Sequence, residues 1–134
     1  MKKKIANPLL DEDIAFTKSI IEARELAEKK AVDLSALHKK NVYPLFFVRP
    51  STKDIFIGYI SEPTRAAKME AFDIMSSKES ITLAGEIILA TSLLKDESHE
   101  AFSSLDSKYD DVFLGGCIDA AGHVKLLLNT LKKK

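Results

Sequence analysis

The sequence has very little cysteine, which limits how the chain can be held together. Its 134 residues contain one cysteine and no tryptophan. A single cysteine excludes an internal disulfide, so the sequence is typical of a reducing compartment such as the cytosol. A chain of this length is expected to form one domain with a hydrophobic core of its own.

The sequence also lacks a hydrophobic run that is long enough to cross a bilayer. Its longest apolar stretch, residues 81–94, is interrupted by Glu86 and falls short of the about 20 residues that a spanning helix needs. Residues 1–6 carry lysines, but no apolar segment of signal-peptide length follows them. We therefore expect no signal peptide and no contact with a membrane.

An excess of positive charge, which nucleic-acid grooves need, is missing as well. Basic and acidic residues balance at 20 each, yet six of the lysines lie at the two ends, in residues 2–4 and 132–134. The body of the chain is therefore acidic. Because a nucleic-acid groove needs a basic face, we expect no binding to nucleic acid, and the lysine ends are typical of solvated tails.

Motifs for catalysis or metal binding are absent from the sequence. The three histidines have no zinc spacing with each other or with Cys117, and the acidic residues 96–111 do not follow the calcium-loop pattern. Cys117 falls in an apolar helical stripe, which favours a buried thiol over a nucleophile. Asp119 and His123 are four residues apart on one helix, where a surface ion pair is expected rather than a catalytic pair. We predict no catalytic residue, no metal and no cofactor.

What the sequence does contain is a concentration of aromatic residues between Val42 and Ile60, five of the ten in the chain. Two apolar runs, 42–48 and 55–60, flank a polar centre in which Pro50 favours a turn. This pattern predicts a β-hairpin with apolar residues on both faces. Helices of the same chain are one candidate cover for these faces, and a docked partner or second copy is the other.

Helical patterns surround this hairpin on both sides. A long helix is expected from about Glu12 to Lys30, and it either continues through Leu37 or breaks near Asp33. Three further helices are expected over residues 64–76, with Ser61 as its cap, over residues 83–95, with Ser80 or Thr82 as its cap, and over residues 109–131. The second of these is apolar on nearly every side, so we expect it to lie across the hairpin with Ile88 buried. Leu127 is expected to be buried in the last helix.

These elements predict an α+β fold with a long N-terminal helix, a two-stranded antiparallel hairpin and three packed C-terminal helices. Residues 1–134 are expected to form one domain, with residues 1–41 as the N-terminal helical segment and 42–134 as the hairpin and helical core. Gly116 and Ala120 indicate a close approach of a neighbouring element to the last helix.

The order of short motifs in residues 42–134 resembles that of small bacteriophage morphogenesis proteins of the tail assembly chaperone kind. A strand ending in Arg49-Pro50 is followed by an alanine-containing helix start at 65–68 and by Gly-Glu-Ile-Ile-Leu at 85–89. An acidic segment at 95–97 then precedes Asp-Val-Phe-Leu at 111–114, which opens a last helix ending in lysines.

The resemblance implies a non-enzymatic virion assembly protein that binds another phage protein through an apolar surface. Its partners would be the tape-measure or tail-tube protein. The alternative is a structural protein of the virion, capsid-stabilising or a connector, with capsid or portal partners; a small enzyme is less favoured. We expect a homo-oligomer that associates through the hairpin, located in the cytoplasm of the bacterial host or in the virion. The predicted partner-binding residues are Tyr43, Phe46, Phe47, Phe56, Tyr59, Gly116 and Ala120.

Overall fold

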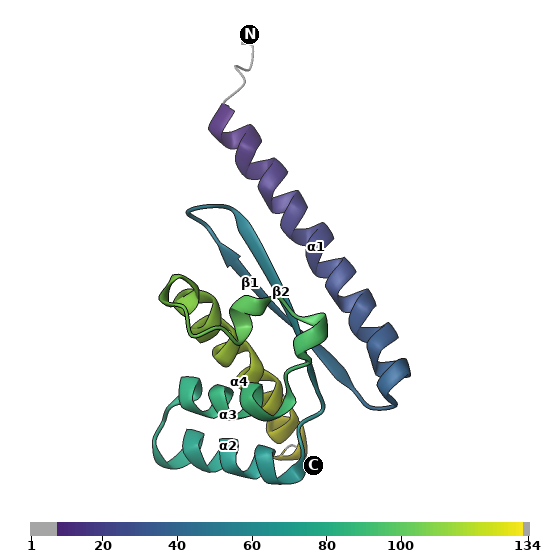
Figure 1. The fold of residues 1–134 in the computed structure, drawn as a ribbon, viewed down its shortest axis with the longest axis vertical. Coiled ribbons are helices and arrows are strands. Elements are labelled where there is room, and N and C mark those ends of the chain that lie inside the picture. Colours follow the sequence, from purple (N-terminus) through teal and green to yellow (C-terminus); the bar gives the residue numbers. More distant parts are fainter. Residues whose placement is uncertain (1–7, 133–134) are drawn as a thin grey trace.

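A computed structural model describes residues 8–132, with side chains described for residues 11–124 (Figure 1). The helices are α1 (Pro8–His38), α2 (Arg65–Ser77), α3 (Ile81–Ser92) and α4 (Asp110–Lys132), and the strands are β1 (Val42–Arg49) and β2 (Asp54–Ser61). Three short 3-10 turns, η1 (Lys95–Glu97), η2 (Glu100–Phe102) and η3 (Ser107–Tyr109), join α3 to α4. This arrangement confirms the predicted α+β class.

The two strands form an antiparallel hairpin whose two faces differ in their cover. Pairing runs from Val42 opposite Ser61 to Arg49 opposite Asp54. Alternate residues of a strand point to opposite faces, so Leu45 and Phe47 lie on one face and Val42 and Phe46 on the other. Helices of the same chain lie against both faces, as the first of the two candidate covers requires.

Helix α1 covers one face of the hairpin and runs along it (Figure 1). Its buried residues Ala31 and Leu34 form a small cluster with Val42 and Tyr59. The helix continues to His38 without a break at Asp33, and Lys39 follows with a left-handed φ of 58°, a common way for a helix to end. Of the two predicted courses, the continuous one is therefore confirmed.

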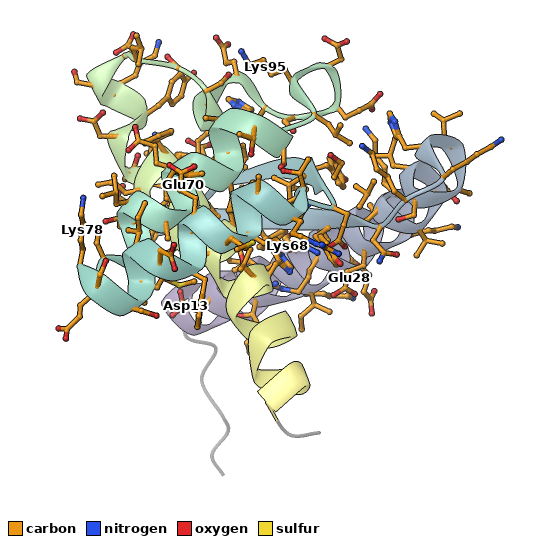
Figure 2. All side chains as sticks on the ribbon, turned by 90° about the horizontal axis from the view of Figure 1, so that it is seen from below. Asp13, Glu28, Lys68, Glu70, Lys78 and Lys95 are labelled. Carbon is orange, nitrogen blue, oxygen red and sulfur yellow. The ribbon has the colours of Figure 1, made fainter. Side chains whose placement is uncertain are left out.

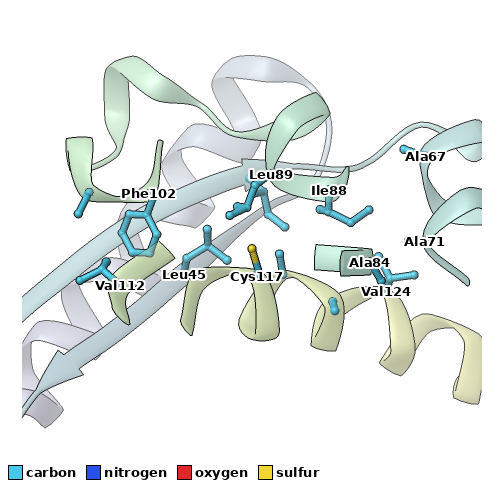
Figure 3. Packing of buried hydrophobic residues seen from close by; sticks show 14 of the residues in the cluster. Leu45, Ala67, Ala71, Ala84, Ile88, Leu89, Phe102, Val112, Cys117 and Val124 are labelled. Atoms are coloured by element: carbon cyan, nitrogen blue, oxygen red, sulfur yellow. The ribbon is translucent and has the colours of Figure 1, made fainter. Parts of the chain in front are cut away.

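The other face of the hairpin belongs to the main core, which α3, α4 and the turn η2 complete (Figure 3). Leu45, Phe56 and Ile60 of the strands meet Phe102 of η2 and Val112 of α4 there. The largest fully buried side chain is the ring of Phe102. Leu127, which was predicted to be buried, lies outside the residues whose side chains the structure describes.

Helix α3 does not lie across the hairpin, contrary to the prediction. It packs between α2 and α4, and only the residue after its end, Leu93, forms a bridge to Ile60 of β2 (Figure 1). Ile88 is fully buried, as predicted. An apolar helix needs cover on several sides, but its composition does not say which elements supply it.

One helix start departs from the prediction, and another agrees with a predicted alternative. Ser61 belongs to β2, and it is Thr64 that caps α2 by accepting a hydrogen bond from the Ala67 amide at 3.2 Å. Ser80, one of the two candidates, caps α3 by accepting from the Leu83 amide at 3.2 Å. Helix α3 ends at Ser92 because Leu93 is extended.

Candidate partner-binding surface

The residues predicted to bind a partner divide into a buried group and a half-buried group. Phe56, Tyr59 and Ala120 are buried hydrophobic residues, and Gly116 is buried beside them. The chain's own elements cover all four, so none of them offers surface to a partner in this structure. The half-buried group consists of Tyr43, Phe46 and Phe47.

Tyr43 is fixed by contacts at both ends of its side chain. Its ring stacks on that of His123, with centroids 4.8 Å apart, and its hydroxyl donates to Glu62 Oε1 at 2.5 Å. Burial and the neighbouring Glu62 carboxylate raise the pKa of Tyr43 to about 12. Lys68 of α2 forms a salt bridge with the same carboxylate. Tyr43 therefore ties the hairpin to α2 and α4.

Phe46 and Phe47 point to opposite faces of β1 and meet different helices. The Arg24 guanidinium of α1 lies over the Phe46 ring, 4.3 Å from its centroid. Phe47 packs on Gly115 of α4 so closely that a Cβ at that position would overlap the ring. Each ring is thus partly covered by one helix.

Both edges of the hairpin are also occupied by the chain itself. At the β2 edge, the Leu94 amide donates to Tyr59 O at 2.8 Å and the His99 amide donates to Ile57 O at 3.0 Å. The Ser98 hydroxyl accepts from the Tyr59 amide at 2.9 Å. These contacts satisfy the backbone groups that an added strand would need.

At the β1 edge, two side chains of α4 take the place of a neighbouring strand. Asp119 Oδ2 accepts a hydrogen bond from the Phe46 amide at 2.9 Å, and His123 Nε2 lies 3.2 Å from Pro44 O. Asp119 and His123 were expected to pair with each other on the surface. Instead, each contacts the backbone of β1, since α4 packs alongside this strand.

Arg49 fastens the end of β1 to the start of α4. Its guanidinium donates from Nε and Nη2 to the two carboxylate oxygens of Asp111, at 2.8 and 2.9 Å, and from Nη2 to Lys108 O. The hydrogen bond raises the pKa of Arg49 and lowers that of Asp111. The same guanidinium lies 5.1 Å from the centroid of the Phe56 ring. A cavity beside this pair is lined by Asp54, His99 and Lys108. The Arg49 guanidinium at its wall is already paired with the Asp111 carboxylate.

Exposed apolar side chains do occur next to the predicted residues, on the outer side of α4. Leu114 is 49% exposed and Ile118 is 52% exposed. Leu114 directly precedes Gly115 and Ile118 follows it by three residues, and Phe47 packs on that glycine. We call Phe47, Leu114 and Ile118 the α4 surface. Leu114 and Ile118 were missed in the sequence because they fall outside the buried stripe; apolar residues at such positions were the available sign.

Most other surface positions carry charge. The side chains of Glu28 on α1, of Glu70 on α2 and of Lys78 directly after α2 are exposed (Figure 2). Exposed apolar side chains also occur on α1 and singly elsewhere, such as Met69 and Leu105. Against this background, the α4 surface is a local apolar feature of the described chain.

The described residues show a deeply buried thiol and no assembled metal site. Burial raises the pKa of Cys117 to about 11, so the thiol stays protonated and is a poor nucleophile at neutral pH. Among residues 8–132, no group of three histidine, cysteine or acidic side chains is placed to hold a metal ion. Across the same range, every helix is too short or too polar to cross a membrane.

Comparison of the chain with protein-family models, curated proteins and solved structures finds no match. The likeness to tail assembly chaperones thus remains a prediction from the order of short motifs. Inferences about function depend on the fold and on the surfaces described above.

Proposed function

We propose that this chain is a non-enzymatic phage assembly protein of the tail assembly chaperone kind, which binds another phage protein through the α4 surface. The observation that carries the proposal is the exposure of Leu114 and Ile118 beside Phe47. Clustered apolar side chains at the surface of a folded protein often mark an interaction site. The proposal keeps one predicted contact residue, Phe47, and moves the contact from the hairpin to α4.

The α4 surface is held on a rigid support, which favours binding. Gly85 of α3 lies directly against the backbone of Cys117, so the two helices cross at close contact. Asp119 and His123 join the same helix to β1. A surface whose side chains are already placed loses less conformational entropy when a partner docks.

An apolar strip along a helix fits the apolar face of a partner helix. The resemblance to tail assembly chaperones points to the tape-measure protein, with the tail tube as a second partner. The proposal therefore assigns the α4 surface to a helical segment of the tape-measure protein.

Co-expression with single phage proteins tests this assignment. The tagged chain is produced with the tape-measure protein of the same phage, and separately with its tail-tube, capsid and portal proteins. We expect the tape-measure protein to co-purify with the wild-type chain, and the double variant Leu114→Asp/Ile118→Asp to lose it. Leu105→Asp, which changes a fully exposed leucine in the segment before α4, is the matched control and should retain the partner.

Circular dichroism first establishes that the variants are folded. Two results would then contradict the proposal. Retention of the tape-measure protein by the double variant would contradict the assignment to α4. Selective capture of the capsid or portal protein would contradict the chaperone function and favour the structural virion component.

A further inference from the structure

Gly122 is the one glycine whose presence the described chain does not explain. The sequence has five glycines, and all of them lie within the described residues. A Cβ added at Gly58, Gly85, Gly115 or Gly116 would lie closer than 3.0 Å to another residue, so each of these glycines makes room for a neighbour. At Gly122, apart from the surrounding backbone of α4, nothing in the described residues lies within 4 Å of an added Cβ.

The backbone conformation of Gly122 does not require glycine either. The residue lies in the interior of α4, and no glycine of the described chain has a positive φ. Glycine is nevertheless among the least favourable residues inside a helix, because it loses more backbone freedom on folding than alanine does. A glycine that weakens its helix and has no close neighbour in its own chain indicates a neighbour from another molecule.

Gly122 lies next to the α4 surface, one turn further along the helix. Leu114, Ile118 and Gly122 follow each other at intervals of four residues, so they lie along one side of α4. Side chains of a helix lean toward its N-terminus, so the bare backbone that Gly122 leaves lies beside Ile118. The side chain of Ile118 is 52% exposed. A partner helix that docks on the α4 surface therefore also reaches Gly122.

The other two glycines of α4 show which kind of neighbour such a position holds in this fold. The ring of Phe47 lies on Gly115, and the ring of Phe102 lies on Gly116. In both cases the missing Cβ lets an aromatic ring approach the helix backbone, and an added Cβ would overlap that ring. Both glycines of α4 that have a neighbour thus accommodate an aromatic side chain.

We propose that Gly122 receives an aromatic side chain of the partner protein, which packs on the helix backbone beside Ile118 when the partner helix docks. This inference rests on the proposed function and adds the chemistry of one partner residue at the same surface. Gly122→Ala has open space in the free chain and favours the helix, so it stabilises the fold. In the complex, the same methyl group takes the space of the aromatic ring. Stability and binding therefore change in opposite directions.

Binding of the full chain to the immobilised tape-measure protein of the same phage, measured by biolayer interferometry, tests the assignment. Gly122→Ala should raise the dissociation constant by at least about tenfold, and Gly122→Leu should abolish binding, because the added atoms overlap the partner's ring. Urea unfolding should show that Gly122→Ala is at least as stable as the wild type, which excludes misfolding as the cause. Ala66→Leu, which adds the same bulk at an exposed position of α2, is the matched control and should bind like the wild type.

Substitutions in the partner test which residue lies on Gly122. Each aromatic residue in the segment of the tape-measure protein that the chain binds is replaced by leucine, one at a time. One replacement should weaken binding to the wild-type chain at least about tenfold. The same replacement should remove the difference between the wild type and Gly122→Ala, because the ring that the methyl group displaces is then missing.

The results distinguish failure of this inference from failure of the proposed function. Unchanged or tighter binding by both Gly122 variants, while Leu114→Asp/Ile118→Asp loses the partner, would overturn the inference and leave the proposed function standing. The inference would also be overturned if no aromatic replacement removed the effect of Gly122→Ala. Failure of the wild-type chain to bind the tape-measure protein would overturn the proposed function, and this inference with it.

Discussion

At the scale of single residues, the core is organised around the ring of Phe102, which two glycines enclose. A Cβ added at Gly58 of β2 would lie 2.8 Å from this ring, and one added at Gly116 of α4 would lie 2.7 Å from it. The predicted close approach at Gly116 therefore involves Phe102. The close crossing of two helices occurs elsewhere, where Gly85 of α3 meets the backbone of Cys117.

Glycine substitutions in α3 and α4 should test the close crossing of these two helices. Gly85→Ala is expected to lower the free energy of unfolding by at least about 2 kcal/mol, because the new Cβ would overlap the Cys117 carbonyl and force α3 and α4 apart. Gly122→Ala is the matched change in open space and should raise stability by roughly 0.5 to 1 kcal/mol through helix propensity. Urea unfolding of both variants checks this. Similar effects of the two substitutions would show that the α3–α4 crossing is placed incorrectly.

Glu62 should make stability depend on pH in the acidic range. Burial opposes ionisation of its carboxylate, but hydrogen bonds from Lys68 and Tyr43 outweigh burial and hold the pKa of Glu62 below its ordinary value. A carboxylate whose pKa is lower in the folded than in the unfolded state contributes stability above the ordinary pKa, and this is lost as the pH falls through the folded-state pKa. Glu62→Gln should therefore cost about 1 kcal/mol near pH 7.

The cost of Glu62→Gln should shrink as the pH is lowered from the ordinary pKa of 4.5. Chemical denaturation of the wild type and the variant at a series of pH values measures the difference between them. A difference that stays constant from about pH 7 to about pH 3 would mean that the charge of Glu62 does not contribute.

At the scale of elements, the packing of α1 on the hairpin changes along the helix. Ala27, Ala31 and Leu34 in its C-terminal part are buried, whereas Phe16 and Ile20 in its N-terminal part are only half-buried. The Ser35 hydroxyl adds a link by accepting from the Val42 amide at 2.8 Å. The C-terminal part of α1 is thus the better anchored one.

Hydrogen exchange should report this difference within α1. Amides of residues 15–22 should exchange about tenfold or more faster than amides of residues 27–34. Local opening is easier where fewer apolar contacts are lost. Uniform protection along the helix would contradict the gradient in packing.

The fold class was predictable from sequence because periodicity and turn residues act locally. The strands around Pro50 and the helix cap at Ser80 depend on neighbouring residues alone. Contacts between distant segments were not predictable in this way. Asp119 and His123 bind β1 across more than 70 residues of sequence, as in the hydrogen bond from Phe46, which spans 73.

The candidate site was predicted only in part, for a related reason. Apolar composition marks Phe56 and Tyr59 as well as Phe47, but it does not distinguish a residue that its own chain covers from one that remains accessible. Burial of the first two requires α1, η2 and α4 to be in place. Leu114 and Ile118 were not predicted because they lie outside the regular apolar stripe of the last helix.

At the scale of the whole molecule, the hairpin is an internal support with helices on both faces. The apolar side chains that remain exposed are spread over several helices and the segment before α4, and Leu114 and Ile118 are those that lie beside the glycine on which Phe47 packs. The hairpin thus lies inside, and the proposed docking surface on α4 lies outside. Such an arrangement suits an assembly protein, which gathers other subunits without becoming a permanent part of the product.

Quantitative mass spectrometry of purified phage particles, compared with infected cells, tests this account most directly. We expect the chain to be abundant in infected cells, where it co-purifies with the tape-measure protein, and to be absent from finished particles. A defined number of copies in every particle would contradict the assembly function and identify the chain as a structural component of the virion.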